Sequence, residues 1–129
     1  MQEGTYLDLG HMHVTGGCKR LTPVLARIGD KWTLLVVSIL AKGPLRFSEL
    51  KRRINGISQR MLTFTLRALE RNGLVSRTVH PAVPPHVEYA LTDLGHSLLV
   101  PIRHLTTWVG EHIDCVEEAQ REYDARNED

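Results

Sequence analysis

A three-residue turn between two short amphipathic segments restricts the fold of this chain more than any other feature. The turn, Asn-Gly-Ile at residues 55–57, follows a segment, residues 47–54, in which apolar side chains recur at intervals of three and four. After the turn, Ser58 is a favourable N-cap and Gly73 suits the left-handed position that follows a helix, which predicts a helix over residues 59–72. Two helices joined by so short a turn are typical of a helix-turn-helix.

Two β-rich runs, residues 74–80 and 86–91, follow the second helix. In the second run Val87, Tyr89 and Leu91 fall on one face, an alternation typical of a half-buried strand. The five residues between the runs include three prolines, which predicts a stiff, extended loop joining a hairpin. A helix-turn-helix followed by a hairpin is the winged-helix arrangement, so we expect a mainly α fold with a small β-hairpin wing (α+β).

Two further helices are expected before this unit. Thr22 is a suitable cap for a short helix that ends at Gly29. Asp30 can cap a second helix that reaches about Lys42 and is apolar on nearly all sides. The second of these helices should therefore form the centre of the core.

One long helical region is expected after the hairpin. Thr92 caps it, and its apolar residues stay in phase as far as Val116 across Pro101, where we expect a kink or a brief break. The resulting domain prediction is a flexible arm (1–20), a winged helix-turn-helix domain (21–116) and an acidic tail (117–129).

The charge of the chain is unevenly distributed. Its 129 residues suit one domain, and the formal net charge is only +1. Residues 42–77, however, hold nine Lys or Arg against two Glu, a net charge of +7, whereas residues 111–129 carry −6. A basic middle indicates a polyanion partner, although a solvated surface would show the same charge.

The second helix of the helix-turn-helix carries side chains that suit base recognition. Gln59 and Arg60 lie in its first turn, and such side chains make bidentate contacts to adenine and guanine. Phe64, on the same face, is predicted either to contact a thymine methyl group or to pack under the wing. The predicted DNA-binding residues are Ser58, Gln59, Arg60, Thr63, Phe64 and Arg67 on this helix, Lys51, Arg52 and Arg53 before the turn, Arg46 and Arg77 at or in strands, and His86 on the wing.

Several sequence blocks, in order, resemble the HxlR-type winged helix-turn-helix transcription regulators. The blocks are KWTLL (31–35), GPLRFSEL (43–50), GISQRML (56–62), LERNGLVSR (69–77) and PPHVEYALT (84–92). The resemblance covers roughly residues 18–109. It implies a bacterial or archaeal dimer that binds a roughly palindromic operator and pairs through its N- and C-terminal helices.

The resemblance also implies, for some members, a response to oxidants or electrophiles through a cysteine ahead of the first helix. Cys18 is the candidate, and the neighbouring Lys19 and Arg20 favour its reactive thiolate, although the Cys-Pro pair common in the family is absent here. The alternative is a plain free thiol. Cys115 is expected to be a small, buried or half-buried residue.

The apolar seam of the last helix is longer than one small winged helix covers by itself, so we expect it to pair with a second copy. The predicted dimer-interface residues are Leu25, Trp32, Leu98, Ile102, Leu105, Trp108, Val109 and Ile113.

Other functional classes find little support in the sequence. It contains no paired-carboxylate motif, phosphate-binding loop or nucleophile elbow, so we expect no enzyme and no cofactor. The histidines show no metal-ligand spacing, so no metal is expected. Two alternatives stay open: a winged helix that docks onto protein instead of an operator, and a regulator triggered by a small apolar ligand held between the central and C-terminal helices.

The sequence predicts no membrane partner. Its longest near-apolar run, residues 34–41, is too short to span a bilayer, and the N-terminus does not resemble a secretory signal. A cytoplasmic protein whose partners are double-stranded DNA, a second copy and a small-molecule or oxidant effector is the expectation.

Overall fold

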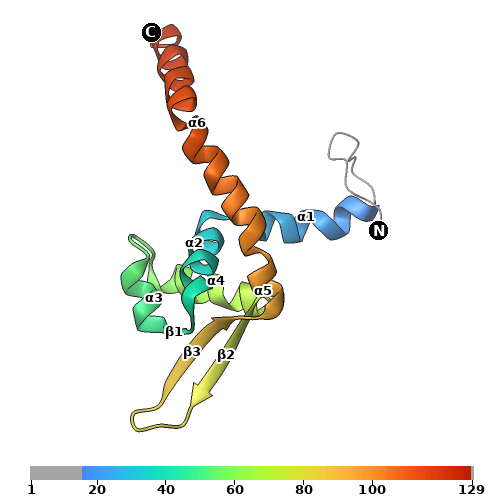
Figure 1. Ribbon diagram of the computed structural model, residues 1–129, viewed down its shortest axis with the longest axis vertical. Helices are drawn as coiled ribbons and strands as arrows, with labels where there is room; N and C mark the ends of the chain where they lie inside the picture. Colours follow the sequence, from blue (N-terminus) through green and yellow to red (C-terminus); the bar gives the residue numbers. More distant parts are fainter. Residues whose placement is uncertain (1–15, 129) are drawn as a thin grey trace.

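A computed structural model describes the backbone of residues 16–128 and the side chains of residues 19–128. Helices pack around a small core, a β-hairpin extends from one end, and a long helix extends from the other (Figure 1). The elements in chain order are α1 (Gly16–Ile28), α2 (Lys31–Ile39), a 3-10 turn η2 (Leu40–Lys42), β1 (Leu45–Arg46), α3 (Phe47–Arg53), α4 (Gln59–Arg71), β2 (Val75–His80), β3 (His86–Leu91), α5 (Asp93–Ser97) and α6 (Leu99–Arg126). The predicted winged helix-turn-helix is confirmed.

Local capping begins α2, α4 and α5 where the sequence predicted them to begin. The side-chain oxygens of Asp30, Ser58 and Thr92 each accept a hydrogen bond from the backbone N–H three residues later, at 3.3, 3.0 and 3.0 Å. Gly56, in the turn, and Gly73, after α4, have φ values of +86° and +77°, which L-residues with side chains rarely adopt. The starts of α2, α4 and α5 and the end of α4 thus follow from single residues.

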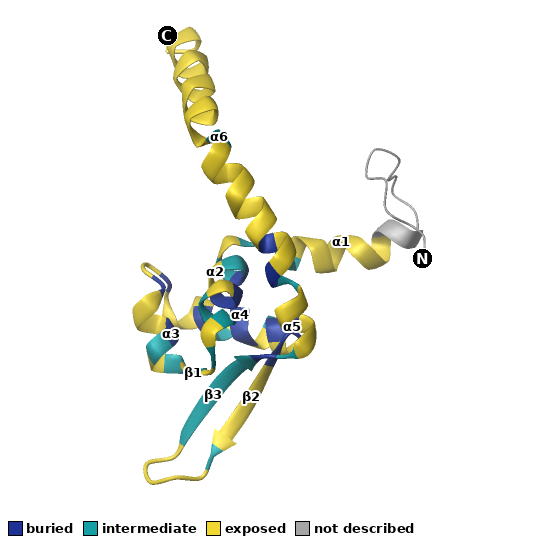
Figure 2. Ribbon diagram, in the orientation of Figure 1, coloured by how far each residue is buried: buried dark blue, intermediate teal, exposed yellow. Residues whose placement is uncertain are grey.

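The core lies where α2, α4 and the base of the sheet meet. Buried Val36, Val37 and Leu40 pack with the apolar face of α4, which includes Leu62 and Leu66. Figure 2 shows this buried centre, with most of α1 and of α6 exposed around it. The central position predicted for α2 is therefore confirmed.

The sheet contains a third strand besides the predicted hairpin, at Arg46, which the sequence placed at a strand without a pairing partner. Two-residue β1 pairs with β3, so the strand order is β1-β3-β2, all antiparallel. Leu45 lies opposite Tyr89, and Arg46 lies opposite Glu88. A strand this short leaves no alternation pattern to detect, and only its pairing with β3 defines it.

The first helix begins earlier than predicted. It starts at Gly16 rather than after Thr22, and Pro23 lies inside it. A proline inside a helix costs the hydrogen bond to the carbonyl four residues before, here that of Lys19, and on this exposed helix water can replace that bond. Residues 16–20 of the predicted arm are therefore helical, and its residues 1–15 lie outside the described part.

The last helical region is divided and longer than predicted. It breaks at Leu98, between α5 and α6, rather than at Pro101 itself, because the proline ring disfavours a helical carbonyl four residues earlier. α6 then continues through most of the predicted acidic tail to Arg126. That segment is rich in Ala, Glu, Gln and Arg, which are strong helix formers. None of the described helices combines the length and apolar character needed to cross a membrane.

Candidate nucleic-acid interface

The exposed face of α4 gathers most of the predicted contact residues. Gln59, Arg60, Thr63, Phe64 and Arg67 together line one depression that opens to solvent. They share this face because α4 turns its other side, with Leu62, Leu66 and Leu69, into the core. We refer to the five residues as the α4 face.

Ser58 has a local role as well as a predicted one. Its hydroxyl oxygen accepts the N–H of Met61 at 3.0 Å and so caps α4. The hydroxyl is exposed, and its proton remains able to donate to a phosphate. The cap also leaves the N–H groups of the first turn pointing outward, where they favour anionic ligands.

Phe64 packs against α1, whereas one of the two predictions for it was packing under the wing. The guanidinium of Arg27, from α1, lies over its ring at 4.7 Å from the centroid, a cation–π contact. Phe64 also lines a groove between α1 and α4 with Pro23 and Val24. The prediction that Phe64 packs under the wing is therefore wrong, because α1, not the hairpin, covers its side of α4. The ring stays about half exposed, at 52%.

Three consecutive cations end α3 on the other side of the turn. Lys51, Arg52 and Arg53 are all exposed and occupy the last turn of α3, where positive charge also stabilises the helix dipole. Among residues 19–128 the ion pairs are His80–Glu88 and Arg121–Glu118. Within that range, neither these three cations nor the arginines of the α4 face are neutralised by a carboxylate.

Arg77 and His86, both predicted to bind DNA, lie on opposite faces of the wing. Arg77 and Tyr89 are cross-strand partners and line a hollow against α4 with Arg67 and Glu70. Side chains alternate along a strand, so His86, an odd number of residues from Tyr89, belongs to the opposite face of the hairpin. The structure therefore brings Arg77 to the α4 face but not His86.

Arg46 also lies away from the α4 face. It is the cross-strand partner of Glu88, on the same side of the sheet as His86. Its backbone N–H donates to the Glu49 carboxylate at 2.8 Å, which helps to begin α3. Arg46 thus has a structural role in addition to the predicted contact.

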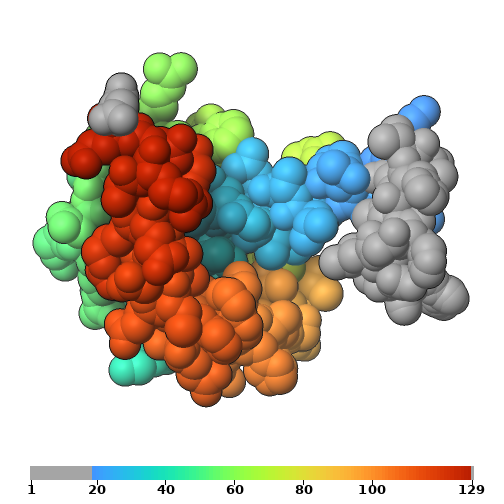
Figure 3. Space-filling model, turned by 90° about the horizontal axis from the view of Figure 1, so that it is seen from above, coloured from blue at the N-terminus to red at the C-terminus, as the bar shows by residue number. Residues whose placement is uncertain are grey.

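The predicted dimer residues divide into two groups. Leu25, Leu105, Trp108, Val109 and Ile113 are all exposed, and Trp108 is 53% exposed. In the view from above, α1 and α6 leave the body in different directions, so neither helix covers the other along its length (Figure 3).

The remaining dimer predictions fall within the chain's own core. Ile102 is only 5% exposed, and Trp32 and Leu98 pack partly buried against the core. Lys31 additionally lies over the Trp32 ring, with its nitrogen 4.5 Å from the centroid. Ile102 is therefore not available as a seam residue, because the first turns of α6 dock onto the body of the same chain.

The two cysteines differ in what the structure shows of them. Cys115 is exposed on α6, so the prediction of a buried or half-buried residue is wrong for the single chain. Cys18 belongs to the first turn of α1, and its side chain lies outside the described residues.

Residues 27–117 match the family described as HxlR-like helix-turn-helix. The chain belongs to this family. It is a transcriptional regulator of the helix-turn-helix type, as the resemblance predicted.

Curated relatives carry the same description. An HTH-type transcriptional regulator of Methanothermobacter thermautotrophicus is 54% identical over 81 residues, which span 63% of this chain and 62% of the relative. The regulator YkvN of Bacillus subtilis is 50% identical over 97 residues, covering 75% of this HxlR-like chain and 81% of YkvN. The chain thus spans about three fifths of the archaeal relative's length.

Solved structures agree with the fold. The putative transcriptional regulator ytfH from Salmonella typhimurium has 39% identity and a TM-score of 0.71, with 79% of this chain and 90% of ytfH covered. The redox regulator HypR in its reduced form has 37% identity and a TM-score of 0.70, with coverages of 77% and 98%. Both of these proteins are described as regulators.

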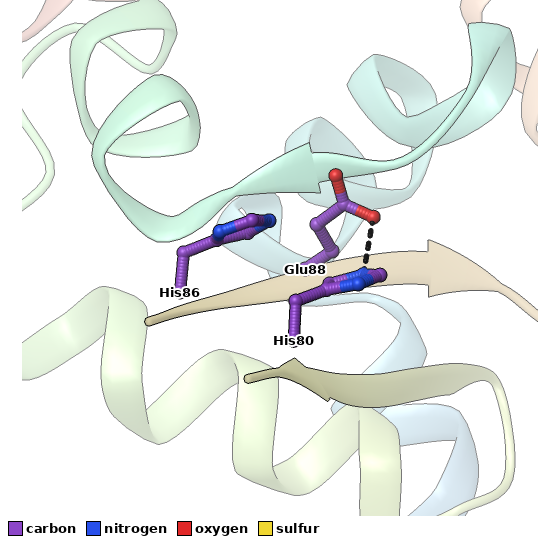
Figure 4. A group of neighbouring side chains, drawn as sticks. All are labelled: His80, His86 and Glu88. Atoms are coloured by element: carbon purple, nitrogen blue, oxygen red, sulfur yellow. Dashed lines mark hydrogen bonds and ion pairs between the residues drawn. The ribbon is translucent and has the colours of Figure 1, made fainter. Parts of the chain in front are cut away.

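The sequence analysis named His86 only as a DNA contact and did not predict the cluster of side chains to which it belongs. His80, His86 and Glu88 gather on the wing, and each offers a ligand atom within 4.8 Å of the others (Figure 4). The signal that would have found them is the hairpin register, because His80 and His86 flank the loop symmetrically and face each other across it.

Proposed function

We propose that this HxlR-like regulator binds a roughly palindromic operator as a homodimer, with α4 of each protomer in the major groove. The observation that carries the proposal is the α4 face, where five side chains suited to DNA share one open depression beside cations that pair with no carboxylate among residues 19–128. In helix-turn-helix proteins the second helix reads base edges with its N-terminal residues. Gln59 and Arg60 occupy the corresponding first turn.

The contact residues fall into two roles under this proposal. Gln59, Arg60 and Thr63 read bases, while Phe64 meets a thymine methyl group at the edge that Arg27 leaves uncovered. The phosphate-binding set is Lys51, Arg52, Arg53, Ser58, Arg67 and Arg77, with Arg46 and His86 reaching the backbone from the other side of the wing.

The exposed apolar residues of α1 and α6 support the dimer. α6 has 28 residues, and beyond Ile102 it leaves Leu105, Trp108, Val109 and Ile113 uncovered. Contiguous exposed apolar surface of this kind marks an interaction site. A second copy that covers it would set the two α4 helices about one DNA turn, ~34 Å, apart. Such a regulator acts on chromosomal DNA in the cytoplasm.

The test compares two substitutions in operator binding. Arg60→Ala should cost roughly 1–3 kcal/mol per contacted base pair and relax sequence preference, because it removes a base contact. Lys51→Ala should weaken binding to all sequences about equally, because it removes a phosphate contact. Fluorescence anisotropy with operator and scrambled duplexes distinguishes the two, and identical profiles for both variants would show that α4 is not the recognition helix.

The same titrations repeated across salt concentrations address the docking-module alternative. A dimer that neutralises on the order of 6–10 phosphates should lose affinity steeply as salt rises. A flat salt response would favour the protein-docking module instead.

We further propose an oxidant response through Cys18. Support comes from the similarity to HypR, a redox regulator, and from Lys19 and Arg20, which follow Cys18 in the sequence. Modification in the first turn of α1 would alter the proposed interface and with it the spacing of the two α4 helices. After a mild oxidant, operator affinity should change severalfold in the wild type and in Cys115→Ser but stay constant in Cys18→Ser. Equal responses in all three proteins would exclude Cys18 and favour a bound small ligand as the trigger.

A further inference from the structure

The wing carries a cluster of potential metal ligands on the face turned away from α4. His80 comes from the end of β2, and His86 and Glu88 come from the start of β3 (Figure 4). His80 and His86 are directly paired across the hairpin, and Glu88 lies one strand repeat further, on the same face. We propose that His80, His86 and Glu88 form a binding site for a divalent first-row transition-metal ion such as Zn²⁺.

The distances within the cluster suit such a site. The three ligand atoms lie within 4.8 Å of one another, and the two imidazole rings are stacked with centroids 4.7 Å apart. In a tetrahedral Zn²⁺ site with bonds of about 2.0–2.2 Å, ligand atoms lie roughly 3.4 Å apart. The side chains of His80 and Glu88 are 40% and 34% exposed, which leaves them room to rotate by the remaining distance.

The donor types select the class of metal. Two imidazole nitrogens and one carboxylate oxygen are the ligands of many three-residue Zn²⁺ sites, with water at the fourth position. Imidazole favours Zn²⁺, Ni²⁺ and Cu²⁺, whereas Mg²⁺ and Ca²⁺ prefer oxygen ligands throughout. The site therefore takes a transition metal in preference to the abundant hard cations.

The backbone around the cluster brings the ligands together before any metal arrives. Six consecutive residue pairs join β2 to β3, and the His80–His86 pair is the last before the loop. That loop, residues 81–85, contains three prolines, whose fixed φ angles limit its freedom. The ladder and the loop together hold the two histidines face to face, so little ordering of the backbone opposes metal binding.

One existing contact already joins two of the three proposed ligands. Glu88 already pairs with His80, with Nε2 and Oε1 2.9 Å apart, rather than with Arg46, its partner on the next strand. A metal ion would replace this contact and be held by both side chains. Arg46 is the cation nearest along the sheet, and its exposed side chain can turn into solvent when the metal adds positive charge.

The location gives the site a consequence for regulation, and this step rests on the proposed operator binding. The wing is expected to lie along the DNA. A divalent cation bound to the wing would therefore change both the charge and the stiffness of the wing. If metal binding alters DNA affinity, DNA must alter metal affinity by the same factor. Metal binding itself does not depend on that step.

The test measures metal binding by the tag-free protein without DNA. His11 and His13 could bind metal independently, so a His11→Gln/His13→Gln background is used throughout. Isothermal titration with Zn²⁺ should show one ion per chain, and Co²⁺ should give the visible absorption of a tetrahedral complex. His80→Gln, His86→Gln and Glu88→Gln should each lower Zn²⁺ affinity at least about tenfold. His96→Gln, a matched histidine variant on α5, should leave it unchanged.

A second readout locates the ion. Histidine ring signals of His80 and His86 in NMR spectra should shift on addition of Zn²⁺, and those of His96, His104 and His112 should not. Equal Zn²⁺ affinity in all variants, or shifts confined to the α5 and α6 histidines, would overturn the site. Operator binding measured without metal tests the proposed function separately. A negative result in the metal experiment therefore leaves the operator-binding result interpretable, and the reverse also holds.

Discussion

Replacing Leu105 and Val109 by glutamate should convert the protein into a monomer and lower operator affinity on the order of 10²- to 10⁴-fold. Both side chains are exposed in the single chain and lie one turn apart on α6, where the proposed partner covers them. Burying two carboxylates in an apolar seam is strongly unfavourable. A monomer engages only one half-site and loses the advantage of two linked contacts.

Sedimentation velocity and anisotropy titrations measure the two effects on the same samples. The 14.6 kDa chain should sediment as a monomer in the double variant and as a species of about twice that mass in the wild type. Thr107→Glu is the matched control, because it adds a charge to the opposite side of α6, near Glu111 and Asp114. A wild type that sediments as a monomer at micromolar concentration would refute the dimer.

Gly95→Ala should destabilise the fold by about 2–4 kcal/mol, well above a typical surface substitution. Gly95 lies buried in α5, and a Cβ there would overlap the carbonyl oxygen of Leu74. It would also lie 3.2 Å from a methyl carbon of Leu91. The backbone can relieve these contacts only by moving α5 away from the base of the wing.

The same carbonyl explains why that movement is costly. The Leu74 oxygen accepts the N–H of Thr92 at 3.1 Å, and the Thr92 hydroxyl donates to the Gly73 carbonyl at 2.6 Å. Displacing α5 therefore strains two hydrogen bonds that join α5 to the end of α4 and the start of β2. Urea unfolding followed by circular dichroism measures the loss.

Gly110→Ala provides the control for Gly95→Ala. Gly110 is on exposed α6, where an added Cβ meets no atom within 4 Å, so the change should stabilise the helix by about 0.5–1 kcal/mol. Equal effects of the two substitutions would show that the close approach at Leu74 does not constrain the fold.

Local sequence signals predicted most of the helix-turn-helix correctly. The caps at Asp30, Ser58 and Thr92 and the glycines at 56 and 73 each act through one hydrogen bond or one backbone angle. Such signals are readable because their physical cause lies within three or four residues. The sequence also predicted which residues make up the α4 face, because helical periodicity alone assigns Leu62 and Leu66 to one side of the helix and Gln59 and Thr63 to the other.

Errors arose where a residue's neighbour is distant in sequence. Phe64 meets Arg27 rather than the wing, and Ile102 enters the core of its own chain rather than the seam. Periodicity indicates that such residues are apolar and on one face, but not which surface covers that face. The start of α1 and the continuation of α6 differed for another reason. Pro23 weakens a helix but does not forbid it, and the predicted acidic tail is rich in strong helix formers.

The sequence by itself determined the order of the helix-turn-helix and the hairpin, the starts of α2, α4 and α5 and the residues that α4 exposes, because these depend on short-range hydrogen bonds and on the helical repeat. Only the tertiary structure decided the pairing of β1 with β3, the close packing of Gly95 on Leu74 and the grouping of His80, His86 and Glu88. Each of these three joins residues from different elements. Their geometry is set by register and packing, which come into existence only when the chain folds.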